Sequence, residues 1–187
     1  MRLPGHPVAT ETRRAGRSDV PAVPDGYHSV TPWLVSRDTG RVIDFAVAAF
    51  GAHEIAQVVD ETGYVGHAEI RIGDSVVALF DARPGWPDTP ALLRLFVDDA
   101  DATVARAVAA GADVVTPVTL LAFGDRVGRV RDPLGNIWWI QSHVEDVTWA
   151  ELAVRSEDPA AMAAMREVQD SLDCELRRRV PPGSSVT

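Results

Sequence analysis

Residues 33–52 read WLVSRDTGRVIDFAVAAFGA, and residues 92–112 read LLRLFVDDADATVARAVAAGA. Each stretch predicts a short apolar strand, an aspartate that caps a helix, an alanine-rich helix, and a Gly-Ala pair that ends the helix. The second copy follows the first by 61 residues at the aspartates and by 60 at the glycines. This repeat predicts two similar half-domains in one chain.

Three further strands are predicted after each helix, because short β-branched runs alternate with turn residues. They cover 54–60, 64–72 and 75–82 in the first half, and 113–119, 125–131 and 137–144 in the second. Both halves therefore have the order βαβββ. We assign a single domain to residues 27–148, with half-modules at 28–80 and 91–144 and a proline-rich linker at 81–90.

The two ends of the chain differ in composition from this domain. Residues 1–26 are rich in Arg, Pro and Gly and show no regular period, which predicts a flexible lead. Residues 149–187 predict a helical extension and tail, beginning with the capping pair Asp158-Pro159. Five apolar residues share one face of this helix: Ala161, Met165, Val168, Leu172 and Leu176. We expect it to pack on its own domain or to clasp a partner subunit.

Charge and cysteine content exclude several classes of function. All 18 basic residues are arginine, and the 27 acidic residues give a net charge of −9, which argues against binding nucleic acid or an anionic membrane surface. No apolar run reaches the ~18 to 20 residues of a membrane span. Lysine is absent, which excludes Schiff-base catalysis. A single cysteine and the absence of an apolar export signal after Arg13 and Arg14 predict a cytoplasmic protein.

Three stretches carry a resemblance to a known family: VTPWLVSRD at 30–38, GHAEIRIGDSVVALFD at 66–81 and FGDRVGRVRDPLGNIWWIQSHVEDV at 123–147. With the tandem βαβββ order, they resemble the vicinal oxygen chelate superfamily and, within it, PhnB-like glyoxalase/bleomycin-resistance proteins. The resemblance covers about residues 28–148. It implies an α+β fold whose two modules form curved mixed sheets around a small-molecule cavity, with their helices outside and the C-terminal helix added.

Metal-dependent members of this family take four His, Gln or Glu ligands, one from the first and one from the fourth strand of each half. The resemblance places four residues without such ligand groups there: Thr31, Ala78, Leu92 and Trp139. A shift of two residues brings in Trp33, Phe80, Arg94 and Gln141, which do not restore the set. We therefore predict no metal and no other cofactor. A separate hypothesis is a new metal site formed by His67, Glu69 and His143.

Strand alternation selects the side chains that can face the cavity. In strand 64–72, one face carries His67, Glu69 and Arg71. Alternation and the internal symmetry then give seven ligand-binding candidates: Trp33, Arg71, Arg94, Phe96, Trp139, Gln141 and His143. Trp138 is expected to point to the opposite face from Trp139. Arg126, Arg129 and Arg131 are expected in a charged turn or on a dimer surface.

These predictions support three hypotheses of function. The first is a metal-independent homodimer that binds a small organic molecule in the cavity of its paired modules, as bleomycin-resistance proteins sequester a drug. The alternative is a metal-independent lyase, isomerase or hydrolase in which Glu69 is a general base and His67 carries a proton; without catalysis, the two residues form an ordinary polar pair. A third is a dimeric accessory protein whose terminal helix docks onto a partner.

Overall fold

The computed structural model describes residues 20–179, so most of the predicted flexible lead lies outside the described residues. The elements follow in chain order: β1 (Trp33–Ser36), α1 (Thr39–Phe50), β2 (His53–Val59), β3 (Val65–Ile72), β4 (Ser75–Asp81), β5 (Leu92–Phe96), α2 (Ala100–Ala109), β6 (Asp113–Leu120), β7 (Asp125–Arg131), β8 (Ile137–His143), α3 (Trp149–Arg155) and α4 (Pro159–Arg177). Both halves show the predicted βαβββ order. The short helix α3 is an addition to what the sequence predicted.

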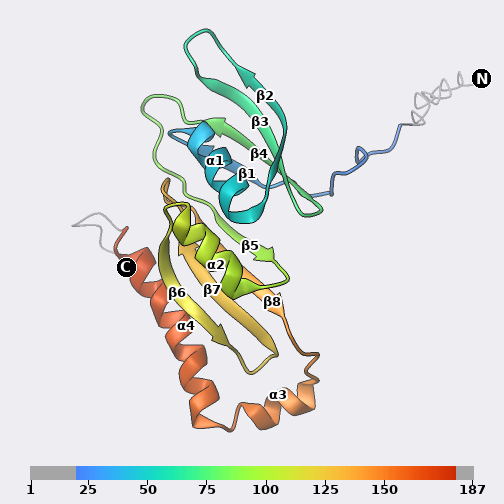
Figure 1. Cartoon of the computed structure of the whole chain (residues 1–187), viewed down its shortest axis with the longest axis vertical. Helices are drawn as coiled ribbons and strands as arrows, with labels where there is room; N and C mark the ends of the chain where they lie inside the picture. Colours follow the sequence, from blue (N-terminus) through green and yellow to red (C-terminus); the bar gives the residue numbers. More distant parts are fainter. Residues whose placement is uncertain (1–19, 180–187) are drawn as a thin grey trace, which may run out of the picture.

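Two four-stranded sheets form the framework of the molecule (Figure 1). The first has the order β1-β4-β3-β2 and the second has the order β5-β8-β7-β6. In each sheet the first strand of the half runs parallel to the fourth, while the other neighbours are antiparallel. The α+β fold with two mixed sheets is confirmed.

The repeated aspartates act as the predicted helix caps. The Asp38 carboxylate accepts a hydrogen bond from the Arg41 amide at 3.0 Å, and the Asp99 carboxylate accepts one from the Ala102 amide at 2.9 Å. Gly51 ends α1 with a φ of 67°, a left-handed conformation that glycine adopts without steric cost. The same local chemistry therefore starts both helices at equivalent places in the two halves.

Helices α1 and α2 share one apolar core beneath the two sheets. Ala46 and Ala49 from α1 and Ala107 from α2 are fully buried in it. Phe50 packs on Trp138 with ring centroids 4.8 Å apart, and the Arg106 guanidinium donates a hydrogen bond to the Ala49 carbonyl at 3.1 Å. The two halves are thus joined by packing as well as by the linker.

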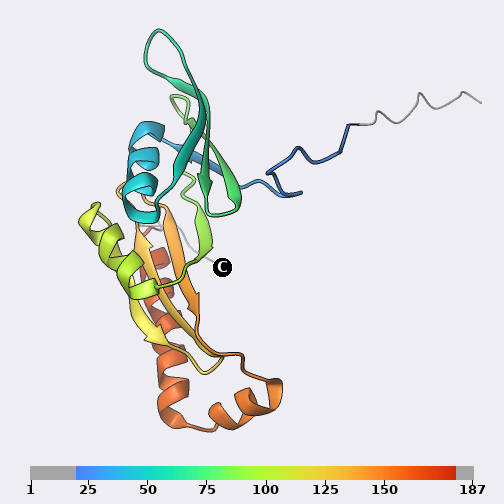
Figure 2. The same cartoon turned by 45° about the vertical axis from the view of Figure 1, so that its right-hand side comes forward.

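Helix α4 covers the other face of the second sheet. It runs beside β6 (Figure 1 and Figure 2). Gly128 and Val130 of β7 face α2, whereas Val127 and Arg129 face α4, because successive side chains of a strand point to opposite faces. Val168 of α4 is 5% exposed and packs against Leu121 and Val127. The apolar stripe of the terminal helix therefore packs on its own chain.

The expectation that Arg129 lies on a charged surface is wrong. Its side chain is 2% exposed, because α4 covers it and accepts its hydrogen bond at the Val168 carbonyl. The neighbouring Arg126 is part-exposed and pairs with Asp101 at 2.7 Å. Arg131 bonds Glu175 of α4 at 2.9 Å and Asp113 at 2.6 Å.

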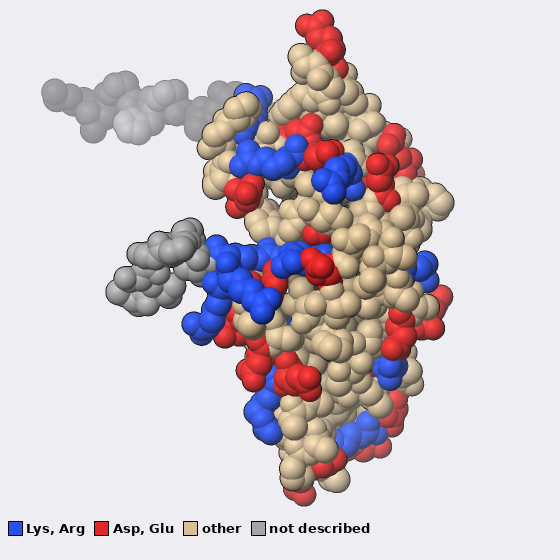
Figure 3. Space-filling model, turned by 60° about the vertical axis from the view of Figure 1, so that its left-hand side comes forward, with Lys and Arg blue, Asp and Glu red and all other residues tan. Residues whose placement is uncertain are grey.

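On the face of the molecule shown in Figure 3, basic side chains gather near the middle, with acidic side chains beside them. Among residues 20–179, no helix combines the length and the apolar character needed to cross a membrane.

Candidate ligand-binding site

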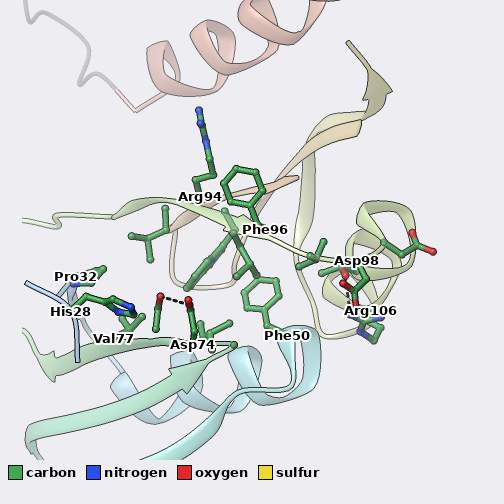
Figure 4. A pocket seen from close by; sticks show the side chains of 18 of the residues that line it. His28, Pro32, Phe50, Asp74, Val77, Arg94, Phe96, Asp98 and Arg106 are labelled. Atoms are coloured by element: carbon green, nitrogen blue, oxygen red, sulfur yellow. Dashed lines mark hydrogen bonds between the residues drawn. The ribbon is translucent and has the colours of Figure 1, made fainter. Parts of the chain in front are cut away.

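A cleft of about 750 Å³ lies between the two halves of the chain. Its walls come from β5, from the turn between β3 and β4, and from the segment that precedes β1 (Figure 4). Phe50 and Trp138 supply apolar surface from the shared core, and Phe96 supplies more from β5. Arg94 is a cation on the same wall. The cleft combines apolar walls with a few polar groups, as small-molecule sites usually do.

Arg94 and Phe96 are the two predicted ligand-binding residues that line this cleft. They share one face of β5 and project away from Phe50 and Asp74 (Figure 4). Phe96 is 61% exposed, which is unusual for a phenyl ring and leaves it free to contact a bound molecule. Phe50 and Asp74 are not among the predicted site residues, because neither a helix end nor a turn in the first half indicates locally that it will face β5.

A second polar group lies on the first sheet, around Glu69. The Tyr27 hydroxyl donates a hydrogen bond to Glu69 Oε2 at 2.5 Å, and His67 Nε2 lies 3.4 Å from Glu69 Oε1. The bond to Glu69 raises the pKa of Tyr27. Arg71 donates a hydrogen bond to the Gly26 carbonyl at 3.1 Å. These contacts hold the segment before β1 on the sheet. No local pattern predicts that Tyr27 joins the pair of His67 and Glu69.

An aromatic group lies on the same sheet. Trp33 is 62% exposed and meets Phe80 edge to face, with ring centroids 5.3 Å apart. Phe80 in turn lies 6.2 Å from Trp86 of the linker. Trp33 is therefore an accessible aromatic surface outside the cleft.

His143 and Gln141 belong to a third group, around Asp125 of β7. His143 Nδ1 lies 2.6 Å from Asp125 Oδ1, and its Nε2 lies 3.0 Å from Asp146 Oδ1. Gln141 donates a hydrogen bond to the other Asp125 oxygen. The bonds to Asp125 and then Asp146 raise the pKa of His143 above its ordinary value of 6.5.

This pKa gives a test of the geometry. Replacing Asp125 with Asn is expected to lower the pKa of His143, because the larger of the two stabilising partners loses its charge. Since the folded pKa is raised, the contact stabilises the wild-type fold fully below pH 6.5 and loses this effect as pH rises through the raised value. An NMR titration of the imidazole measures the pKa of His143 in the wild type and in Asp125→Asn. An unchanged pKa in the variant contradicts the contact between His143 and Asp125.

Trp139 lies in a fourth group, beneath α4. Its indole has the Arg94 guanidinium carbon 4.6 Å from the ring centroid and the Arg129 guanidinium carbon 4.1 Å from it. Trp138, the preceding residue, is 2% exposed and points into the core on the opposite face, as alternation predicts.

The nine predicted site residues thus do not share one cavity in a single chain. Trp33, His67, Glu69 and Arg71 lie on the first sheet, and the other five lie on the second: Arg94, Phe96, Trp139, Gln141 and His143. The single hollow expected from alternation is not found, because α4 occupies the face of the second sheet that was expected to remain open.

The family's metal positions do not fit a metal ion in this chain. Trp33 and Arg94 pair with Ala78 and Trp139 across equivalent parallel strands, which confirms that the two halves match by symmetry at these positions. The resemblance places Thr31, Ala78, Leu92 and Trp139 at the metal positions, and a hydroxyl, a methyl, an isobutyl and an indole group do not supply a usable ligand set. Within the part of the chain that the structure describes, no three His, Cys, Asp or Glu side chains gather where they could hold a metal. His143 lies with Asp125 and Asp146, on the other sheet from His67 and Glu69.

Comparison with known proteins agrees with this fold. The uncharacterized protein Mb0911c of Mycobacterium bovis is 36% identical over 135 residues, which are 66% of this chain and 89% of that protein. The crystal structure of TioX from Micromonospora sp. ML1 is similar at 26% identity with a TM-score of 0.53, over 62% of this chain and 98% of TioX. The Arabidopsis thaliana gene product AT5G48480 is similar at 27% identity with a TM-score of 0.51, over 63% of this chain and 98% of that one.

A family model matches residues 26–140, a span that includes the first βαβββ half and the second half as far as the middle of β8. The chain belongs to the Glyoxalase/Bleomycin resistance protein/Dioxygenase superfamily.

Proposed function

We propose that this protein binds a small organic molecule in the cleft between its two halves and sequesters it without a metal ion. The observation that carries the proposal is the 750 Å³ cleft, whose lining residues include Phe50, Phe96 and Arg94. A hollow of this size suits a small ligand. The packing of α1 on α2 in one buried core supports binding, because a preformed site loses little conformational entropy when it is filled.

Metal independence is part of this proposal. It is supported by the side chains at the family's ligand positions, where Ala78 and Trp139 stand on the fourth strands. Elemental analysis of protein purified without an affinity tag tests it. Stoichiometric zinc, nickel, manganese or iron contradicts this part of the proposal.

A metal-independent enzyme is the second candidate, and the contacts of Glu69 favour it. The Glu69 carboxylate accepts a hydrogen bond from Tyr27 and lies 3.4 Å from His67. This arrangement suits proton transfer between neighbouring groups. In this case, Glu69 acts as general base and His67 as proton carrier. Glu69→Gln then abolishes turnover while ligand binding persists. Under sequestration, the bound molecule is recovered unchanged and Glu69→Gln has little effect on binding, whereas Phe96→Ala weakens it.

We also propose that the protein is a cytoplasmic homodimer of the PhnB-like subgroup. The motifs around β3–β4 and β7–β8 support the subgroup. Exposed apolar side chains on the strands support the dimer, because Trp33 and Leu92 are 62% and 56% exposed in one chain. Light scattering tests the dimer: the chain mass is 20.2 kDa, so a particle of that mass contradicts it and a particle of twice that mass supports it.

Ligand retention is the main test of binding. Protein purified from its native host is expected to keep a small molecule in native mass spectrometry. Phe96→Ala is expected to reduce its affinity by at least roughly tenfold, since burial of a phenyl ring contributes about 1.5–3 kcal/mol. Trp149→Ala is the matched control, because Trp149 is 87% exposed on α3 and lies outside the cleft. A wild-type protein that retains no small molecule contradicts the proposal, as does equal loss in the two variants.

A further inference from the structure

Three neighbouring strands place two cations on one indole ring. Arg94 of β5 and Arg129 of β7 both pair in register with Trp139 of β8. Their guanidinium carbons lie 4.6 and 4.1 Å from the centroid of the indole ring. The three side chains therefore form one compact row beneath α4.

The charges of this row are uncompensated. Among residues 20–179, neither Arg94 nor Arg129 makes a salt bridge, whereas the adjacent Arg131 makes two. Arg129 donates hydrogen bonds only to neutral oxygens, those of Thr116 at 3.1 Å and Val168 at 2.5 Å. Burial, with a smaller contribution from Arg94, lowers the pKa of Arg129 to about 10. It still carries its charge at neutral pH, and a buried charge without a counter-ion is costly.

The unsatisfied polar atoms of this row point to the same need. Arg129 is 2% exposed, and its Nε–H has no hydrogen-bond partner within the described part of the chain. The same holds for the Nε1–H of Trp139. Both groups are donors, and so are the remaining nitrogens of the two guanidinium groups. A partner for this row must therefore supply acceptor atoms and negative charge.

There is room for such a partner beside the row. A cavity of about 190 Å³ is lined by Arg94, Arg129 and Trp139 from the sheet and by Leu172 from α4. Arg94 lines both this cavity and the larger cleft. A molecule that contacts Arg94 can place a charged group in the smaller cavity.

We propose that an oxyanion of a small molecule, a carboxylate or a phosphate, binds between Arg94 and Arg129 at Trp139 beneath α4. The planar guanidinium fork matches the oxygens of either group. This inference rests on the proposed function and names the chemical class of its ligand. Helix α4 contributes to this site in two ways: the Val168 carbonyl accepts a hydrogen bond that orients Arg129, and Leu172 lines the cavity.

Isothermal titration calorimetry with three probes that share a phenyl ring tests the inference: benzoate, phenyl phosphate and neutral benzamide. At least one of the two anions is expected to bind at least about tenfold more tightly than benzamide, because a charge-assisted hydrogen bond is lost with the neutral probe. The anion that binds more tightly distinguishes the carboxylate from the phosphate. Equal affinity of all three probes, or no binding of either anion, overturns the inference.

Charge-removing variants locate the site. Arg94→Met is expected to weaken anion binding by at least about tenfold and to fold normally, since Arg94 is exposed. Arg129→Met is expected to have a similar effect. Arg126→Met is the matched control, because Arg126 lies on the same strand as Arg129 and pairs with Asp101 instead. Anion affinity that is unchanged in Arg94→Met, or that falls equally in Arg126→Met, overturns the inference.

The failure of this inference can be separated from the failure of the proposed function. One result leaves the binding function standing and removes the oxyanion site. In that result, native mass spectrometry shows a retained molecule, Phe96→Ala releases it, and Arg94→Met and Arg129→Met still retain it. If the protein retains no molecule and binds none of the three probes, the binding function itself fails.

Discussion

Trp138→Ala is expected to lower the free energy of unfolding by about 3–5 kcal/mol, the usual cost of removing a large buried aromatic side chain. The indole is 2% exposed and packs on Phe50 of the first half. Its Nε1–H also donates a hydrogen bond to the buried Asp132 carboxylate at 3.1 Å. The substitution therefore removes packing between the two halves. It also removes one hydrogen-bond donor from the buried Asp132 carboxylate.

Urea unfolding followed by circular dichroism measures this loss. Trp149→Ala is the control, because Trp149 is 87% exposed, and it is expected to change the free energy of unfolding by no more than about 0.5 kcal/mol. A loss below about 1 kcal/mol in Trp138→Ala contradicts the account of a core shared by the two halves.

Val168→Arg is expected to release α4 from the second sheet. Val168 is 5% exposed between Leu121 and Val127, and its carbonyl accepts the hydrogen bond of Arg129. A second cation at this place has no counter-ion and lies beside a buried one. We expect a cost of about 3 kcal/mol, which raises the undocked population of the helix by roughly a hundredfold.

Amide hydrogen exchange read by mass spectrometry measures this population, because exchange of α4 follows its local opening. Ala163→Arg is the matched control, since Ala163 is exposed on the same helix and receives the same side chain. Exchange in α4 that is no faster in Val168→Arg than in Ala163→Arg contradicts the docking of α4 through Val168.

The repeat in the sequence predicts most of the fold, because the signals that form it are local. Asp38 and Asp99 cap the helices that follow them, and alternation separates Trp138 from Trp139. The sequence pattern also predicts both ends of β7, which begins at Asp125 and ends at Arg131.

The candidate site is predicted less well, because it depends on contacts between distant segments. The apolar stripe of α4 predicts that the helix packs on something, but its period does not say which face of which sheet it covers. Arg129 was expected at the surface, since an arginine in a strand carries no local sign that a helix about 40 residues later will bury it. Tyr27 was not expected beside Glu69 for the same reason. The cleft likewise joins β5 to a turn of the other half.

The acidic composition of the chain does not conflict with an anionic ligand. Several described arginines are paired with acids, as Arg131 is with Asp113 and Glu175. Burial opposes the ionisation of Glu175, but its bonds to Arg131 and Arg179 hold its pKa below the ordinary value. Arg94 and Arg129 differ because no such acid lies beside them in the described chain, so a net negative protein can still present a local cationic site.

A crystal structure of the protein with the small molecule that it retains from its native host tests the central claim most directly. The account predicts electron density in the cleft between the halves, in contact with Phe96 and Arg94. Density for the molecule elsewhere on the chain, with the cleft filled only by water, contradicts it.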